Sequence, residues 1–297
     1  MTDISFIVPC YNEAEAIECF YSKITAVLKG ELSKIDYELI FIDDGSTDNT
    51  LVKIKSLIQS NNKIRYISFS RNFGKEAAIL AGLQNSANTY VCVLDADLQD
   101  PPSLIPEMYR ILETKEYDCV CSRRKNRIGE NKIRSWFAEL FYVIMNRICS
   151  VRLAPGARDF LMMNRNVVEA ILSTKEYIRF FKGMFIWVGF KKKWLDYENI
   201  NRSIGASKWN FLSLTKYALV AISSFTIQPL TWPFFIGITS GLIGFISLYF
   251  HFLAGLLLIL FALQMCFMGI FGYYIATIFL ETKKRPIYII KESNVKK

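Results

Sequence analysis

The feature that most constrains this chain is a stretch of 64 residues, from Tyr217 to Leu280, that contains no Asp, Glu, Lys or Arg. All 36 basic and 27 acidic side chains therefore lie outside it. Leu230 to Phe250 would span about 31 Å as a helix, enough to cross the hydrocarbon of a bilayer, and a second run from Ala254 to Leu280 is longer still. The chain is therefore predicted to join a polar domain to a membrane segment.

Only a few residues around His251 separate the two apolar runs, which predicts a tight two-helix transmembrane hairpin. Basic residues flank the hairpin but are absent from its turn; they are Lys191 to Lys193, Lys208 and Lys216 before it, and Lys283, Lys284 and Arg285 after it. Because Lys and Arg mark the cytoplasmic side of membrane segments, both ends are predicted to be cytoplasmic. The alternative is a re-entrant hairpin that never crosses.

The net charge of +9 raises the question of nucleic-acid binding. The last 17 residues hold six Lys or Arg and two Glu, so a large part of the excess lies just after the apolar stretch. Basic residues in that position typically anchor a chain to anionic lipid. The sequence also has no recognition-helix, zinc-finger or RNA-binding signature, so nucleic acid is not an expected partner.

The single histidine and the pattern of cysteines limit the chemistry that is available. The single histidine, His251, lies inside the apolar stretch, which excludes a Ser-His-Asp triad, a Cys-His pair and a His-rich zinc site in the polar part. The seven cysteines form no C-x-x-C pair, which favours a reduced, cytoplasmic domain. Any chemistry in that domain must rely on carboxylates, Lys, Arg and a metal held by oxygen atoms.

The polar part alternates short apolar, β-branched runs with helix-like stretches. The predicted strands are Ile4–Val8, Glu38–Ile42, Ile64–Phe69, Tyr90–Leu94 and Asp118–Cys121, and the predicted helices are Glu13–Leu28, Thr50–Ser60, Lys75–Asn85 and Ser103–Thr114. This alternation predicts an α/β domain with a mostly parallel, Rossmann-like sheet and helices on both faces. The fingerprints of dinucleotide-binding domains and of P-loop NTPases are absent from the sequence.

Acidic side chains follow three of the predicted strands. They are Glu13 after the first strand, Asp43 and Asp44 after the second, and Asp95, Asp97 and Asp100 after the fourth. Residues i and i+2 of an extended chain point to the same side, so Asp95 and Asp97 can share one target. Paired carboxylates suit Mg²⁺ or Mn²⁺ bridged to a diphosphate. The alternative, that such residues only cap helices and turns, is less favoured because three acidic clusters meet at one edge of a sheet.

Four longer motifs occur in chain order: IVPCYNE at 7–13, IDDGSTD at 42–48, SRNFGKE at 70–76 and DADLQDPP at 95–102. With these motifs the sequence resembles the inverting GT-A glycosyltransferases related to dolichyl-phosphate mannose synthase. Within that family it is most similar to the bacterial polyprenyl-phosphate (bactoprenol) glucosyltransferases, which carry a two-helix C-terminal hairpin. The resemblance continues through 182–189, 202–208 and 281–286, and so covers nearly the whole chain.

The resemblance implies a role for each matching residue. The nucleotide-sugar site would comprise Pro9, Tyr11, Glu13, Asp43, Asp44, Asp95, Ala96 and Gln99. Asp95 and Asp97 match the pair that binds the divalent metal and the diphosphate. Lys182, Arg202 and Lys208 match basic residues that hold phosphates, although Arg202 and Lys208 could also belong to an ordinary juxtamembrane basic patch. The residues expected to act in catalysis are Asp97, Asp159 and Arg202.

Asp159 matches the aspartate of an Asp-Phe-Arg-Leu loop, which is a candidate base in the family. This chain departs from the pattern, because Leu161 stands where the family has Arg and Arg158 precedes the aspartate. A phosphate monoester has a second pKa near 6, so at neutral pH the acceptor is mostly ionised already. Asp159 could therefore orient the acceptor or the metal instead. Tyr273 and Ala276 depart from the family as well, at positions where relatives often carry Glu and Arg.

The expected reaction is transfer of a hexose, from UDP-glucose or UDP-GlcNAc, to polyprenyl (undecaprenyl) phosphate with inversion, for modification of a cell-envelope glycan. The expected partners are the nucleotide sugar, the polyprenyl phosphate and the membrane, with a homo-oligomer and a downstream flippase as further candidates. The expected location is the bacterial inner membrane, as a multi-pass protein with a cytoplasmic catalytic domain. Another lipid acceptor, a non-catalytic nucleotide-sugar-binding scaffold, a transport component and a processive polysaccharide synthase are the alternatives.

The predicted domains are a catalytic domain at 1–205, an interfacial juxtamembrane helix at 206–228, two transmembrane helices at 229–280 and a basic cytoplasmic tail at 281–297. Within the catalytic domain, Ile133 to Ile148 carries an apolar helical stripe. Core packing is the common explanation of such a stripe. Aromatic residues between basic ones favour helices that lie in the headgroup layer; these are Phe180, Phe181, Phe185, Trp187 and Trp209.

Overall fold

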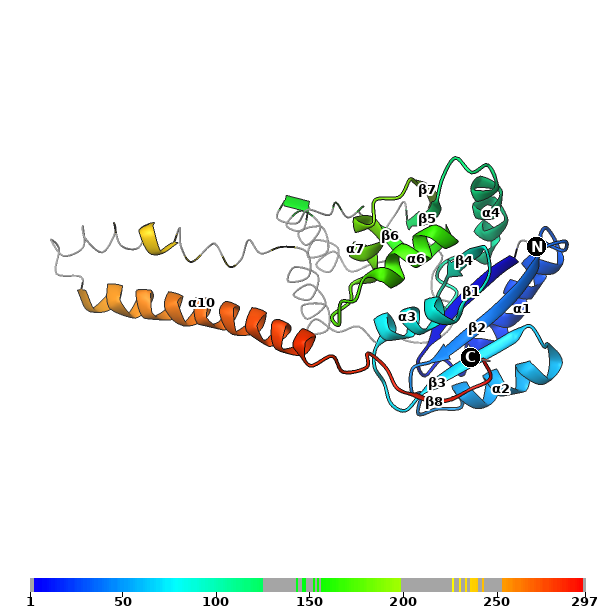
Figure 1. Ribbon diagram of the computed structural model, residues 1–297, viewed down its shortest axis with the longest axis horizontal. Helices are drawn as coiled ribbons and strands as arrows, with labels where there is room; N and C mark the ends of the chain where they lie inside the picture. The colour runs from blue at the N-terminus through cyan, green and yellow to red at the C-terminus, as the bar shows by residue number, and fades with distance from the viewer. Residues whose placement is uncertain are drawn as a thin grey trace.

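The computed structural model of the protein describes residues 3–124, 156–198 and 253–295, with a few isolated positions between them. One eight-stranded sheet runs through these residues in the order β7-β5-β6-β4-β1-β2-β3-β8 (Figure 1). The strands are β1 (Asp3–Cys10), β2 (Asp36–Asp43), β3 (Ile64–Phe69), β4 (Tyr90–Val93), β5 (Cys119–Arg124), β6 (Ala157–Asn164), β7 (Lys192–Tyr197) and β8 (Ile290–Ser293).

The pairing confirms an α/β fold with a mostly parallel sheet. Strands β4, β1, β2 and β3 are parallel neighbours, and β5 and β7 form a second parallel pair. Between these two groups β6 lies antiparallel to both β4 and β5. All five predicted strands are present, and β3 has the predicted bounds. The parallel strands all end at one edge of the sheet, which brings the loops after β1, β2 and β4 together.

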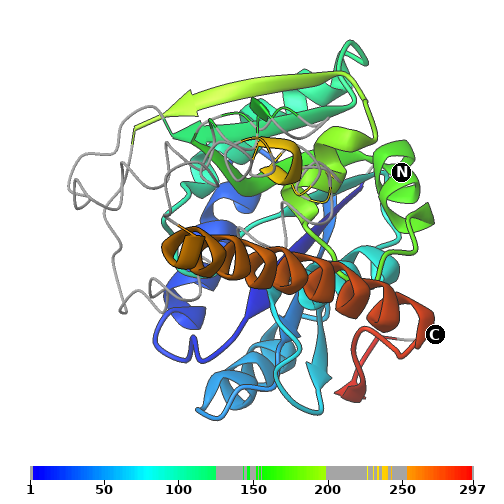
Figure 2. The same ribbon diagram turned by 90° about the vertical axis from the view of Figure 1, so that its left-hand side faces the viewer.

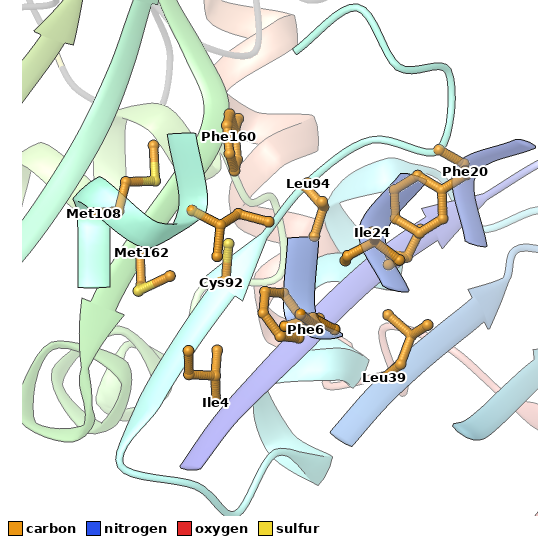
Figure 3. Close-up of a cluster of buried hydrophobic side chains, with 14 of the residues drawn as sticks. Ile4, Phe6, Phe20, Ile24, Leu39, Cys92, Leu94, Met108, Phe160 and Met162 are labelled. Atoms are coloured by element: carbon orange, nitrogen blue, oxygen red, sulfur yellow. The ribbon is translucent and has the colours of Figure 1, made fainter. Parts of the chain in front are cut away.

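Helices cover both faces of the sheet. They are α1 (Ile17–Lys29), α2 (Thr50–Ser60), α3 (Lys75–Asn85), the short 3₁₀ helix η1 (Pro102–Leu104), α4 (Ile105–Glu113), α6 (Arg165–Ser173) and α7 (Phe181–Trp187). The apolar residues of β1 alternate between two buried clusters, because successive side chains of a strand point to opposite faces. Ile4 and Phe6 join the cluster with α1 and α4 that Figure 3 shows, whereas Ile7 packs against α3 on the other face.

Helix α3 packs closely against β1. A Cβ atom added to Gly82 would lie 2.2 Å from Ile7 Cγ2, so only glycine allows this packing. Every residue of α3 from Ala77 to Leu83 is buried, and Ala77, Ala78 and Ala81 belong to the apolar cluster on this face of the sheet. Small side chains therefore bring α3 close against the sheet, and its first residue, Lys75, is held beside the strand ends.

The last described helix, α10 (Leu253–Thr282), projects away from the α/β domain, with its C-terminal end nearest to the domain (Figure 1). Figure 2 is seen from the side of the Leu253 end of α10, and in this view α10 lies in front of the sheet. Its segment Ile259–Thr282 has a mean hydropathy of 1.8, and none of its most apolar part is buried against the rest of the protein. Among the described residues, α10 is the one helix that is long and apolar enough to cross a membrane. Of the predicted first transmembrane run, Leu230 to Phe250, the structure describes only isolated positions.

The segment after α10, predicted to be a basic cytoplasmic tail at 281–297, adds a strand to the sheet. Strand β8 pairs antiparallel with β3 and forms an edge of the sheet. Tyr288 stacks on Phe69 with ring centroids 4.8 Å apart, and the Lys55 ammonium lies 2.6 Å from Glu292. The basic residues dominate the composition of this segment and conceal the strand, whose backbone pairs with the open edge of β3.

Three of the aromatic residues that were predicted to lie in the headgroup layer are buried in the core instead. Phe180, Phe181 and Phe185 are 1%, 3% and 4% exposed, so these three side chains belong to the core and do not reach a headgroup layer. Trp187 is exposed. The stripe from Ile133 to Ile148, the helix at 206–228 and Trp209 lie outside the described residues, apart from isolated positions.

Candidate active site

The loops after β1 and β2 are joined by hydrogen bonds between their motifs. The backbone N–H of Asn12 donates to Ser46 Oγ at 3.0 Å, and the side-chain oxygen of Asn12 accepts the backbone N–H of Thr47 at 2.8 Å. The Glu13 N–H donates to Thr50 Oγ1 at 2.8 Å. The two loops therefore form one unit, with Tyr11 exposed on it and Pro9 and Glu13 partly buried.

Asp43 and Asp44 lie at the end of β2, and both are buried rather than open to a ligand. Asp43 accepts from the Ser46 N–H at 3.1 Å and from Ser68 Oγ at 2.8 Å. Asp44 accepts from the backbone N–H groups of Phe73 at 2.7 Å and Gly74 at 2.9 Å, and thereby holds the turn that begins α3. Burial raises the pKa of Asp44 to about 6, although these two N–H groups oppose the shift.

The glycine of the same motif permits a close loop contact. Gly45 has φ +65, and a Cβ atom there would lie 2.3 Å from the backbone carbon of Arg71. A side chain at this position would therefore force the loop after β2 away from the segment that leads into α3. The contact brings the second and third motifs of the sequence together.

The pair Asp95 and Asp97 follows β4, at the same edge of the sheet. Both oxygens of Asp95 contact the ammonium of Lys75, at 2.7 and 2.8 Å. Asp97 is 9% exposed, and one of its oxygens accepts the Gln99 N–H at 3.1 Å. Ala96, between the two aspartates, is buried. Burial raises the pKa of Asp95, and the neighbouring carboxylates add to the shift while Lys75 opposes it.

Asp159 on β6 faces the same lysine. Lys75 Nζ lies 2.6 Å from Asp159 Oδ2, and Lys182 Nζ, from the first turn of α7, lies 3.6 Å from Asp159 Oδ1. Burial alone would raise the pKa of Asp159, but Lys182, Lys75 and Arg158 outweigh it and hold this pKa well below its usual range. A carboxylate held so firmly in its ionised form is a weak base, which favours an orienting role for Asp159.

Arg158 lies on the other face of β6, because adjacent residues of a strand point to opposite sides. Its Nε donates to Asp100 Oδ1 at 3.1 Å and its Nη2 to the Gln99 amide oxygen at 3.1 Å. Tyr197 of β7 also donates to Asp100. Leu161 shares the face of Asp159 and is 3% exposed in the core. Arg158 therefore does not take the place of the arginine that the family pattern has at 161.

Glu76, next to Lys75, connects α3 to α7. Its Oε2 accepts the backbone N–H of Phe181, the first residue of α7, at 2.8 Å. Burial raises the pKa of Glu76 to about 7, and the charge of Asp159 adds to the shift. The N-terminus of α3 therefore makes two kinds of contact. Through Lys75 it contacts Asp95 and Asp159, and through Glu76 it contacts α7, the helix that carries Lys182.

The structure thus brings together most of the predicted residues at the carboxyl ends of β1, β2 and β4. Arg202 and Lys208 lie outside the described residues. Sequence reasoning assigned no role to Lys75 or Glu76, and it included Asp100 only as one of the acidic residues after the fourth strand. A signal for Lys75 and Glu76 was present, since both lie in the motif SRNFGKE that carries part of the family resemblance.

The residues present fit a divalent cation. Asp95 and Asp97 supply hard oxygen ligands at a strand end, and the contact of the Lys75 ammonium with Asp95 and Asp159 shows that this position attracts positive charge. Among the described residues no group of three or more His, Cys, Asp or Glu side chains is arranged to hold a metal. An ion on these two aspartates would therefore complete its coordination with substrate oxygens and water.

Comparison with known proteins agrees with this geometry. The family model for glycosyl transferase family 2 matches residues 5–172, which include the strand ends described above. The chain is a family 2 glycosyltransferase. The match covers more than half of the chain and contains Asp95, Asp97 and Asp159.

Curated relatives of this glycosyltransferase align over almost its whole length. A putative glycosyltransferase of Bacillus subtilis, CsbB, is 41% identical over 98% of this chain and 92% of its own. A prophage bactoprenol glucosyl transferase homolog of Escherichia coli is 36% identical over 97% of this chain and 98% of its own. The similarity therefore extends past the family domain, through the apolar segment to β8.

A solved structure supports the fold. Glucosyl-3-phosphoglycerate synthase from Mycobacterium tuberculosis, crystallised with Mn²⁺, UDP-glucose and phosphoglyceric acid, superimposes with a TM-score of 0.50. It is 20% identical, and the match covers 75% of this chain and 78% of the synthase. At this identity the comparison supports the α/β fold alone.

Proposed function

We propose that this glycosyltransferase transfers a hexose from a nucleotide diphospho-sugar to the phosphate of a polyprenyl phosphate, with inversion. The observation that carries the proposal is the meeting of two cations, Lys75 and Lys182, with Asp95 and Asp159 at the carboxyl edge of the sheet, in a chain that also carries α10. Relatives named bactoprenol glucosyl transferase, aligned over nearly the full length, support the lipid acceptor and favour glucose as the sugar.

The proposed reaction is a single displacement. An oxygen of the acceptor phosphate forms a bond to the anomeric carbon, while the bond from that carbon to the nucleoside diphosphate breaks and the diphosphate keeps the electron pair. Asp95 and Asp97 would hold Mg²⁺ or Mn²⁺, which when bound neutralises charge on the leaving diphosphate. Lys182 would hold phosphate oxygens, and we keep Arg202 and Lys208 as further phosphate ligands.

Asp159 and its neighbours prepare the site for this reaction. The acceptor is largely ionised at neutral pH, so little is gained by removing a proton. Asp159 instead fixes the positions of Lys75 and Lys182, whose charges favour the approach of two anionic substrates. Gln99, whose amide oxygen accepts from Arg158 at 3.1 Å, lies beside the aspartate pair, in the position proposed for the sugar.

We also propose that α10 spans the membrane and that the catalytic domain is cytoplasmic. Strands β7 and β8 belong to one sheet, on opposite sides of the apolar segment in the sequence. A spanning α10 has its C-terminal end at this sheet and its Leu253 end on the far side of the bilayer. The chain between β7 and Leu253 must then cross once more, which supports the two-helix hairpin. A homo-oligomer and a flippase stay predictions.

A transfer assay tests the donor and the acceptor together. Membranes that contain the protein are incubated with radiolabelled UDP-glucose, UDP-GlcNAc or GDP-mannose, and the lipids are extracted and treated with mild acid. We expect UDP-glucose to label a lipid from which mild acid releases the sugar. Label that resists mild acid would indicate a different lipid acceptor such as diacylglycerol, and absence of labelled lipid with all three donors would contradict the proposal.

The variant Asp97→Asn tests the metal role in the same assay. The amide keeps the size of the side chain but removes the charge that a divalent ion needs, so we expect transfer to fall by about 1000-fold. The thermal midpoint should stay close to that of wild type, because the backbone N–H of Gln99 can still donate to the amide oxygen. Turnover like that of wild type in the presence of Mg²⁺ or Mn²⁺ would reject the role.

A further inference from the structure

The inner end of α10 is joined to the catalytic domain by one carboxylate. Glu281, in the last turn of the helix, accepts two backbone hydrogen bonds through its Oε1, from the Tyr177 N–H at 2.8 Å and the Ile178 N–H at 3.2 Å. These two N–H groups belong to the loop at 174–180 that connects α6 to α7. Hydrogen bonds to an ionised acceptor are among the stronger ones in proteins.

The loop that receives Glu281 is held firmly on its other side. Arg179 is buried, and its guanidinium donates to the carbonyl oxygens of Thr174 at 3.0 Å and Ile171 at 3.2 Å, at the end of α6. The next residues begin α7, where the Phe181 N–H donates to Glu76. A shift of the loop relative to α10 would therefore be passed to α7 and not absorbed within the loop.

The first turn of α7 carries Lys182, which lies 3.6 Å from Asp159. A continuous set of contacts thus leads from the inner end of α10 through the loop to Lys182 and the site. The other attachment of this segment, β8 against β3, is at the far edge of the sheet from β6 and α7. The Glu281 contact connects α10 directly to the Lys182 side of the domain.

From these contacts we propose that Glu281 is a positioning residue, which fixes the distance between the membrane helix and Lys182 and so sets where a membrane-held acceptor phosphate meets the site. The inference rests on the proposed function, since it needs an acceptor whose phosphate is held at the membrane. An acceptor that diffuses freely in water does not need this alignment, because it can approach Lys182 whatever the position of α10. Glu281 therefore affects long-chain acceptors selectively.

Kinetics with two acceptors test the selectivity. For Glu281→Ala we expect kcat/KM for long-chain polyprenyl phosphate in lipid–detergent micelles to fall by about 10- to 100-fold, as for loss of hydrogen bonds to a charged group. With a water-soluble short-chain prenyl phosphate the loss should stay within about 3-fold, and KM for the nucleotide sugar should not change. Glu281→Gln keeps an oxygen that can accept both N–H groups, and should recover most of the activity.

The matched control is Glu292→Ala on β8, which removes the contact with Lys55 but leaves Glu281 in place. This variant should lower activity with both acceptors by the same small factor, if at all. Equal losses with both acceptors in Glu281→Ala would indicate a general effect on folding and would overturn the proposal. An unchanged activity with the long-chain acceptor would overturn it as well.

Hydrogen exchange separates this proposal from the proposed function, because it needs no substrate. In Glu281→Ala the amides of Tyr177 and Ile178 should exchange at least about 10-fold faster, while those of β3 and β8 stay protected. Unchanged exchange at the two amides would show that Glu281 does not hold the loop, whatever the enzyme transfers. If the wild-type enzyme uses neither prenyl phosphate, the proposed function fails, and the selective role of Glu281 fails with it. The exchange result still decides whether Glu281 holds the loop at 174–180.

Discussion

At the scale of single residues, Lys75 connects separate parts of the site. Its ammonium lies between two carboxylates, Asp95 and Asp159, that burial would otherwise tend to neutralise. The position of Lys75 depends in turn on Asp44, which holds the N–H groups of Phe73 and Gly74 at the start of α3. Asp44, expected from the resemblance to lie beside the nucleoside, thus acts here through the backbone that places the lysine.

The same burial makes Asp44 a source of pH dependence. The pKa of its carboxyl is raised from 3.8 to about 6, so between these pH values the folded protein retains a proton that the unfolded chain has released. Folding is therefore destabilised as the pH rises through this range, by up to about 3 kcal/mol. Asp44→Asn cannot ionise, so we expect its stability relative to wild type to increase from pH 4 to pH 6. Thermal midpoints in detergent measured across this range provide the check.

A control with the opposite sign is available on β2. A hydrogen bond from the Lys63 ammonium lowers the pKa of the exposed Asp36 in the folded protein. The ionised Asp36 therefore stabilises the fold at pH values above the pKa that Asp36 has in the unfolded chain, and this stabilisation is lost as the pH falls through the lowered pKa of the folded protein. Asp36→Asn should therefore become less stable relative to wild type as the pH rises. Midpoints of Asp44→Asn and wild type that run parallel from pH 4 to pH 6 would contradict the assignment for Asp44.

At the scale of secondary-structure elements, β8 decides how the end of the chain is used. This strand covers the edge of β3 that would otherwise expose unpaired backbone groups. Asn294, just after β8, extends the pairing, because its side-chain oxygen accepts the Tyr66 N–H at 2.6 Å and its amide donates to the Ile64 carbonyl at 3.3 Å. The C-terminal segment is therefore part of the α/β domain and not only a flank of α10.

Asn294→Ala tests this role of the segment. The substitution leaves the Tyr66 N–H and the Ile64 carbonyl without their side-chain partner, so we expect a loss of about 1 kcal/mol in stability. The neighbouring Ser293→Ala is the control, since the Ser293 hydroxyl has no hydrogen bond to the described residues. Thermal midpoints of the two variants give the comparison. Equal midpoints would show that β8 adds little to the stability of the sheet.

At the scale of the whole molecule, the sheet and α10 together constrain the topology. A helix of 30 residues is about 45 Å long, which places the Leu253 end far from the domain that holds the other end. Both β7 and β8 belong to that domain, so the chain must travel out and back between them. This supports an even number of membrane crossings and agrees with the basic residues on both sides of the uncharged stretch.

Labelling at residue 251 tests the topology. A cysteine is placed at His251 in a background that lacks the native cysteines, and intact cells are treated with an impermeant maleimide. We expect labelling from outside, because a crossing hairpin brings its turn to the outer face of the membrane. Labelling only after lysis would indicate a re-entrant hairpin, and a cysteine at the exposed Lys191 in the catalytic domain provides the cytoplasmic control.

The sequence by itself determined the strands and helices at 4–114, the edge of the sheet at which the acidic residues gather, and the apolar helix, because periodicity and charge are local properties of the chain. The contact of Lys75 with both Asp95 and Asp159 could not be predicted, since residues 75, 95 and 159 meet only when three separate elements pack. The same is true of β8, because a short strand has no lasting structure until the edge of β3 supplies its partners. Tertiary packing likewise buried Phe180 and Phe181, since core volume is set by the whole domain.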